Sequence, residues 1–230
     1  MTSQPKIFCA IDTNDLDRAC ELSASIAPVT GGIKLGLEFF NNFGHQGIEK
    51  VLESCPDAKL FIDLKFHDIP NTVAGAVRGI CNNFAPAYLN VHASGGRDMM
   101  IAAKEACGSE TKLLAVTLLT SLDEKAVQEI GYQSDISAQV EKLAVLAKES
   151  GLDGVVCSAH EIELLRKACD DEFALIVPGI RPSGADIGDQ KRVMSPKCAL
   201  NKGATHLVIG RPITSAQNPA IAAQDILDSL

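Results

Sequence analysis

The sequence lacks any cluster of basic residues. The chain has 230 residues, of which 21 are lysines or arginines and 29 are aspartates or glutamates, so that its formal net charge is −8. Nucleic-acid binding depends on clustered cations that neutralise phosphates, and the composition therefore argues against nucleic acid as the main partner. A few well-placed cations are still enough to bind one small anion.

The cysteines lack the spacing of a metal site. All eight are widely scattered, with no C-x-x-C pair and no histidine at a distance typical of zinc ligands. We therefore expect reduced, mostly buried thiols and no bound metal.

Long apolar runs are also missing. No stretch approaches the ~18 residues that a membrane-spanning helix needs, and the first residues lack the basic and apolar parts of a signal segment. The chain has only 10 prolines, 46% hydrophobic residues and no linker-like or low-complexity segment. We predict one folded domain over residues 1–230 in a soluble, cytoplasmic protein with no membrane partner.

Short apolar or β-branched runs predict eight strands. They are Lys6–Asp12, Gly32–Gly36, Leu60–Lys65, Tyr88–Ala93, Leu113–Leu119, Gly154–Ser158, Leu175–Ile180 and His206–Ile213. Helical spacing lies between them, for example over Leu16–Ala27, Thr72–Asn82, Ile136–Ser150 and Ala159–Ala168. Length alone would also allow two small domains, but eight strand–helix units fit a single α/β (β/α)8 TIM barrel better than a doubly wound sheet.

Catalytic residues of such barrels lie at the carboxyl ends of the strands. Polar residues at those positions are Asp12, Lys34, Asp63, Lys65, Asp68, His92, Thr120, Arg181 and Arg211. Alternation along the third strand places Asp63 and Lys65 on one face. Taken singly, such charges also fit a rim ion pair, and Asp68 also fits a helix cap.

The second strand supplies another cation. Lys34 lies between Gly32 and Gly36 on the same face of that strand, so it is predicted to point into the barrel. Enclosed lysines and carboxylates are costly to desolvate unless all of them are paired. Their joint occurrence favours a functional site over a chance rim pair.

The segment after the third strand, Asp63-Leu-Lys65-Phe-His-Asp68-Ile-Pro-Asn-Thr72, resembles the signature of orotidine 5′-monophosphate decarboxylases. Further blocks occur in the order of that family. They are Ala10–Asp12, Gly32–Gly36, Asn90–Ala93, Leu119–Ser121, Pro178–Pro182, Gly188–Gln190 and Gly210–Ile213.

The resemblance implies decarboxylation of orotidine 5′-monophosphate to uridine 5′-monophosphate in pyrimidine biosynthesis, without a cofactor. Lys34, Asp63, Lys65 and Asp68 would form an alternating charge array, in which Lys65 donates a proton to C6 of the pyrimidine. The carboxylates would keep Lys65 charged and oriented. In a homodimer, Asp68 and Thr72 would reach into the neighbour's site.

Other residues are expected to bind the substrate. The resemblance places Asp12 near the ribose, and Thr120 and Ser121 near the pyrimidine. The loops after strands seven and eight often bind phosphate in barrels, and here they contain Arg181, Gln190, Gly210 and Arg211. Arginine binds phosphate bidentately, which makes Arg211 the first candidate. We further predict that the polar segment 181–190 closes as a lid over the phosphate.

Two other readings remain open. A magnesium-dependent decarboxylase of the 3-keto-gulonate 6-phosphate type has a similar barrel and motif, but it characteristically has a glutamate where this chain has Lys34. The second is a non-catalytic barrel that only binds nucleotides. His92 is interpreted as a core or supporting residue, and Glu38, Asn41 and Asn42 as capping or surface residues.

Overall fold

The computed structural model describes residues 5–133, 135–181 and 194–230. Its strands are β1 (Ile7–Ala10), β2 (Gly32–Gly36), β3 (Lys59–Phe66), β4 (Tyr88–His92), β5 (Lys112–Val116), β6 (Gly154–Val156), β7 (Ala174–Val177) and β8 (His206–Ile209). Each strand pairs in parallel with the next, and β8 pairs with β1 to close the barrel. The predicted (β/α)8 fold is confirmed.

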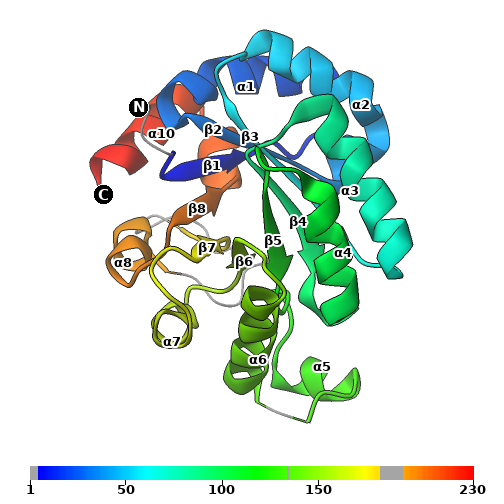
Figure 1. Cartoon of the computed structure of the whole chain (residues 1–230). Coiled ribbons are helices and arrows are strands. Elements are labelled where there is room, and N and C mark those ends of the chain that lie inside the picture. The colour runs from blue at the N-terminus through cyan, green and yellow to red at the C-terminus, as the bar shows by residue number, and fades with distance from the viewer. Residues whose placement is uncertain (1–4, 134, 182–193) are drawn as a thin grey trace.

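Helices surround this barrel (Figure 1). They are α1 (Leu16–Thr30), α2 (Leu37–Ser54), α3 (Pro70–Phe84), α4 (Arg97–Cys107), α5 (Glu124–Glu129), α6 (Ile136–Glu149), α7 (Ile162–Ala168), α8 (Pro196–Asn201), α9 (Arg211–Thr214) and α10 (Pro219–Asp228), with a short 3₁₀ turn η1 (Ala93–Gly95). The last helix, α10, packs against the first, α1. In the described residues, no helix is both long and apolar enough to cross a membrane.

Local sequence signals explain the ends of α1. The side chain of Asp15 accepts a hydrogen bond from the backbone N–H of Arg18 and caps the first turn. At the other end, Gly31 adopts φ 72° and donates its N–H to the carbonyl of Ala27. Glycine favours this left-handed conformation, so the helix stops there and β2 begins at the next residue.

The predicted bounds of several elements were wrong. The eighth strand was predicted to run to Ile213, but it ends at Ile209, and α9 begins at Arg211. Pro212 lies in the first turn of that helix, where its fixed φ is favourable. Similarly, the helix predicted from Ala159 begins only at Ile162.

Aromatic side chains fill the barrel interior near the starts of the strands. The rings of Phe8, Phe61 and Tyr88 meet edge to face, with centroids 5.6 to 6.1 Å apart. A Cβ atom at Gly32 would lie 2.8 Å from the Phe8 ring, so the glycine leaves room for this packing. The packed rings close the interior at that end.

A series of hydrogen bonds through His206 crosses this aromatic layer. His206 contacts the carbonyl oxygen of Pro5 through Nδ1 at 2.6 Å and the hydroxyl of Tyr88 through Nε2 at 2.8 Å. A carbonyl can only accept, so Nδ1 carries the proton and the Tyr88 hydroxyl donates to Nε2. Burial lowers the pKa of His206. The imidazole is therefore a neutral, fully hydrogen-bonded member of the core.

Candidate active site

A cavity of about 510 Å³ opens at the carboxyl ends of the strands. Its polar and charged lining residues are Asp12, Lys34, Glu38, Asp63, Lys65, Thr120, Arg181 and Arg211. Apolar residues such as Leu118 and Pro178 complete the wall. The cavity thus lies where a barrel enzyme binds its substrate.

Three predicted residues meet at the centre of this cavity. Lys34 Nζ lies 3.0 Å from Asp63 Oδ2, and Lys65 Nζ lies 2.6 Å from Asp63 Oδ1. The Lys34 side chain is 9% exposed and that of Asp63 is 12% exposed, whereas Lys65 is 26% exposed. A buried carboxylate therefore holds two ammonium groups, and Lys65 is the more accessible of the two.

The pKa values of Asp63 and Lys34 reflect this arrangement. Burial alone would raise the pKa of Asp63, but Lys34 and Lys65 outweigh burial and hold that pKa well below its ordinary value. Burial would likewise lower the pKa of Lys34, but Asp63 and Asp12 outweigh it and raise that pKa. Both groups are thus charged at neutral pH.

Lys34 also faces a second carboxylate, because Asp12 Oδ1 lies 3.8 Å from its Nζ. The intervening space depends on Gly36. A Cβ atom at this position would lie 3.2 Å from Lys34 Nζ and 3.3 Å from Asp12 Oδ1. The predicted inward position of Lys34 is confirmed, and the small residue beside it leaves room for the ion pair.

Simple alternation does not describe the end of β3. The register with β4 shifts between Ile62 and Phe66, and Lys65 has φ 50°, a left-handed conformation that costs roughly 1–2 kcal/mol in a non-glycine residue. Asn90, which is fully buried, compensates. Its Oδ1 accepts from the Lys65 backbone N–H at 2.8 Å, and its Nδ2 donates to Asp63 Oδ1 at 2.7 Å.

Asn90 is a site residue to which sequence reasoning gave no role. The signal was an amide between Leu89 and Val91 in the middle of the strand, and no role was assigned to it. In the structure, it fixes both the carboxylate and the backbone of the lysine.

Several predicted binding residues line the same cavity. Thr120, Arg181, Gly210 and Arg211 all contribute to its wall. Ser121 lies in the exposed turn next to Thr120 and is not among the lining residues. Gln190 and most of the predicted lid, 182–190, lie outside the described residues.

Two predicted residues lie outside the cavity of their own chain. Asp68 is exposed, and its Oδ1 accepts from the backbone N–H of Ile69 at 2.7 Å, just before α3 begins. Thr72 is exposed in the first turn of that helix. The structure therefore brings together three members of the predicted charge array but not the fourth.

The residues interpreted as supporting or surface residues can also be placed. His92 is partly buried at the end of β4, with its ring 5.4 Å from that of His67, and burial lowers its pKa. Asn41 and Asn42 are exposed, and each bonds a carbonyl one turn earlier. Glu38 is exposed, but it also lines the cavity, which the sequence did not indicate.

The cysteines were predicted to be reduced and mostly buried, and no metal was expected. All eight cysteines are free, and five of them are buried, as predicted. One, Cys157, lines the cavity. In the described part of the chain, no three His, Cys, Asp or Glu side chains are grouped so that they could hold a metal ion.

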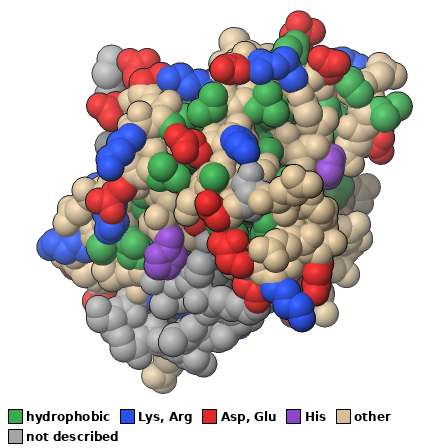
Figure 2. Space-filling model, turned by 90° about the horizontal axis from the view of Figure 1, so that it is seen from below, with side chains coloured by type: hydrophobic (Ala, Val, Ile, Leu, Met, Phe, Trp, Pro, Cys, Tyr) green, Lys and Arg blue, Asp and Glu red, His purple; other side chains and the backbone are tan. Residues whose placement is uncertain are grey.

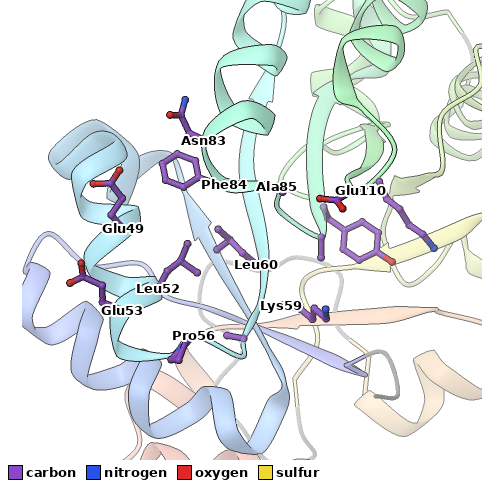
Figure 3. A pocket seen from close by; sticks show the side chains of 14 residues that line it. Glu49, Leu52, Glu53, Pro56, Lys59, Leu60, Asn83, Phe84, Ala85 and Glu110 are labelled. Atoms are coloured by element: carbon purple, nitrogen blue, oxygen red, sulfur yellow. The ribbon is translucent and has the colours of Figure 1, made fainter. Parts of the chain in front are cut away.

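A larger hollow of about 870 Å³ lies at the opposite end of the barrel, where the strands start. Glu49 and Leu52 of α2, Phe84 at the end of α3 and Leu60 of β3 face it (Figure 3). Its exposed charges make no cluster comparable to that around Asp63, and the starting end of a barrel contributes mainly to stability. The smaller, charged cavity is therefore the candidate active site.

Known proteins resemble this chain over nearly its whole length. The model of the orotidine 5′-phosphate decarboxylase / HUMPS family matches residues 5–226. An orotidine 5′-phosphate decarboxylase from Rhodospirillum rubrum is 51% identical over 232 residues, covering 97% of this chain and 93% of the relative. One from Psychromonas ingrahamii is 48% identical, covering 98% and 97%. The crystal structure of orotidine 5′-phosphate decarboxylase from Lactobacillus acidophilus has a TM-score of 0.85 at 34% identity and 98% coverage of both chains.

A closed parallel barrel with a charged cavity at its strand ends defines the class, a (β/α)8-barrel enzyme. The matches in sequence and structure are more specific than the fold. The chain belongs to the orotidine 5′-phosphate decarboxylase / HUMPS family.

Proposed function

We propose that this protein decarboxylates orotidine 5′-monophosphate to uridine 5′-monophosphate in pyrimidine biosynthesis, with Lys65 as the proton donor. The observation that carries the proposal is the placement of Lys34 and Lys65 on the two oxygens of the buried Asp63. The relatives named above carry the same activity in their names.

The reaction needs a positive charge beside C6 of the pyrimidine. When the bond from C6 to the carboxylate breaks, carbon dioxide leaves and the electron pair remains on C6 in an orbital that the ring carbonyls do not stabilise in the ordinary way. An ammonium group beside C6 stabilises this charge and then transfers a proton to the carbon. Lys65 fits this role, because it is the more exposed lysine and Asp63 orients its Nζ.

The phosphate of the substrate needs cations at the rim of the cavity. Arg181 and Arg211 line the rim after β7 and β8. An arginine binds a phosphate through two parallel hydrogen bonds. We assign the phosphate first to Arg211, with Arg181, Gln190 and the Gly210 backbone beside it. Asp12 would contact the ribose, and Thr120 and Ser121 the pyrimidine.

The site is proposed to be shared within a homodimer. Asp68 and Thr72 are exposed outside their own cavity, and between them Ile69 is 66% exposed. Leu37 and Leu119, which follow β2 and β5, are also exposed large hydrophobic residues. A second copy that covers this rim would bury the apolar side chains and bring its own Asp68 to the charge array.

Mixed dimers test the shared site. Lys65→Ala and Asp68→Ala proteins are each expected to be nearly inactive. If Asp68 acts in the partner's site, a mixed dimer contains one intact site, so equal mixing restores about one quarter of wild-type activity. No recovery after subunit exchange, shown independently by differently tagged chains, would place Asp68 in its own chain's site instead.

We propose small molecules as the main partners and the cytoplasm as the location. On the face seen in Figure 2, acidic and basic side chains are interspersed over the described surface. A net charge of −8 gives no extended basic surface for a nucleic acid.

Turnover with and without metal separates the proposal from the magnesium-dependent alternative. Both oxygens of Asp63 already face lysines, which leaves them poorly placed to bind Mg²⁺. Wild-type protein in excess EDTA should consume orotidine 5′-phosphate, measured by absorbance, and Lys65→Ala should lose at least about 10⁴-fold in kcat. Turnover only after magnesium is restored would favour the sugar-phosphate type, and wild-type protein that binds the nucleotide without turnover would favour a non-catalytic barrel.

A further inference from the structure

Two cysteines outside the active site lie side by side. Cys81 near the end of α3 and Cys107 at the end of α4 have their sulfur atoms 3.8 Å apart, although they are 26 residues apart in sequence. Cys107 is 1% exposed, whereas Cys81 is partly exposed. The pair therefore has one accessible thiol and one enclosed thiol.

A small cavity leads to this pair. It has a volume of about 150 Å³ and is lined by both thiols and by the turn from Gly108 to Thr111. Two of its lining residues, Ala85 and Glu110, also line the large hollow at the strand starts, where Figure 3 labels them. One water molecule occupies about 30 Å³. A solute of a few heavy atoms can thus reach the accessible thiol of Cys81 from the surface.

The two thiols differ in acidity. The contact between the two sulfur atoms lowers the pKa of the more exposed Cys81, and the same contact together with burial raises the pKa of Cys107. Elsewhere, burial raises the pKa of Cys9 to about 12 and also raises that of Cys55. The thiolate is the reactive form of cysteine, so Cys81 combines reactivity with access.

We propose that Cys81 and Cys107 form a reversible disulfide when a small hydroperoxide enters this cavity. The Cys81 thiolate attacks the peroxide, the O–O bond breaks, and the sulfur is oxidised to a sulfenic acid, while the departing oxygen takes a proton from solvent and leaves as water or an alcohol. Cys107 then attacks the Cys81 sulfur. The S–S bond forms, the S–O bond breaks, and water leaves with the Cys107 proton.

The geometry suits the second step. The sulfur atoms must approach from 3.8 Å to about 2.05 Å, a movement within the reach of two side chains that already touch. Intracellular disulfides of this kind are usually transient and formed by redox chemistry, and a dithiol would return the pair to its reduced state. The pair lies at the strand-start end of the barrel, away from Lys65 and Asp63, so it is independent of the proposed decarboxylation.

Peptide mapping of the full-length protein tests this site. Folded protein is exposed to hydrogen peroxide, then unfolded in urea with iodoacetamide present so that every remaining thiol is alkylated, and digested with trypsin without reduction. Cleavage after Arg78, Arg97, Lys104 and Lys112 puts the two cysteines in peptides 79–97 and 105–112, neither of which contains another cysteine. A linked pair of these peptides, lost after treatment with dithiothreitol, is the expected result.

Variants separate the roles of the two thiols. Cys107→Ser should give no link but should accumulate a Cys81 sulfenic acid that dimedone traps, whereas Cys198→Ser, a partly buried cysteine elsewhere, should form the link like the wild type. Oxidation of the urea-unfolded chain should lose the preference for this pair. The proposal is overturned if folded wild-type protein keeps both cysteines alkylated by iodoacetamide while other cysteines have been oxidised.

Discussion

The two ends of the barrel interior both bury polar side chains, but they do so in opposite ways. Where the strands start, Tyr88 and His206 are neutral and fully hydrogen-bonded among aromatic rings. Where the strands finish, the buried carboxylate of Asp63 lies 3.0 Å from the ammonium group of Lys34 and 2.6 Å from that of the partly exposed Lys65. Charges cost more to bury than neutral groups, even when they are paired.

The difference separates stability from function within one barrel. The neutral end satisfies its polar atoms with few groups and serves the packing of the core. The charged end combines three ionised side chains with a buried amide and a strained backbone at Lys65. An arrangement this costly is expected only where chemistry requires it.

Neutralising the central carboxylate, Asp63, should cause the largest loss of activity among the changes considered below. In Asp63→Asn, two ammonium groups lose the anion between them, and kcat should fall by about 10³-fold or more. Asp153→Asn is the matched control, because Asp153 pairs with Lys104 at 2.5 Å near the strand starts. Steady-state kinetics of both variants check this, and equal losses of activity would contradict the division between the two ends.

Removing the rim cation should have a smaller effect. Arg211→Ala is expected to lower kcat/KM by about 10²-fold, mainly by raising KM, since a charged hydrogen bond to phosphate contributes about 1.5–3 kcal/mol. The exposed Arg18 on α1 provides the control as Arg18→Ala. If Arg211→Ala kept wild-type efficiency on the phosphorylated substrate, the assignment of the phosphate would be wrong.

Removing the side-chain amide of Asn90 should have a moderate effect on both kcat and the free energy of unfolding. Asn90→Ala leaves the Lys65 backbone N–H without its partner and removes one of the two donors to Asp63 Oδ1, so kcat should fall about tenfold and the free energy of unfolding by about 1–3 kcal/mol. Kinetics and urea denaturation measure the two quantities. A loss of stability with unchanged kcat would show that Asn90 supports the fold only and does not position the lysine.

The neutral residues at the strand starts should make the free energy of unfolding depend on pH, and they should have little effect on turnover. Because burial lowers the pKa of His206 below its ordinary 6.5, the unfolded chain binds more protons around pH 6. The free energy of unfolding should therefore fall as pH drops from 7 to 5. In His206→Asn this decline should be shallower, with turnover at pH 7 nearly unchanged.

Tyr88→Phe is the control for this pH effect. It removes one hydrogen bond to His206 at a cost of about 1 kcal/mol but keeps the imidazole, so the pH dependence should remain. Denaturation at several pH values compares the three proteins. Parallel curves for wild type and His206→Asn would assign the pH dependence to other groups, such as His92.

The fold was predictable because its signals are local. Alternating apolar and helical segments were enough to predict eight parallel strands and their order. The ends of the strands were less predictable, since a strand ends where its neighbours stop pairing. The strand predicted from His206 ran to Ile213, for instance, but β1 pairs with β8 only as far as Ile209.

The site was predictable where charge and strand position coincide. Lys34 and Asp63 stood out because a charged residue near the end of an apolar strand needs an explanation. The left-handed backbone of Lys65 had no signal, because lysine rarely adopts it and Asn90 supports it from another strand. Asp68 lies outside the cavity of its own chain, and its proposed place in a partner's site rests on the resemblance, not on a signal in the strands themselves.

The pairing of β1 with β8 has a consequence for synthesis on the ribosome. Ile7 pairs with Leu207, so the barrel cannot close until nearly the whole chain has been translated. Until then Phe8 lacks part of its packing, and the nascent chain needs protection from aggregation. Gly210 and Arg211 emerge directly after the closing strand, so a premature stop before His206 removes both barrel closure and the rim of the cavity.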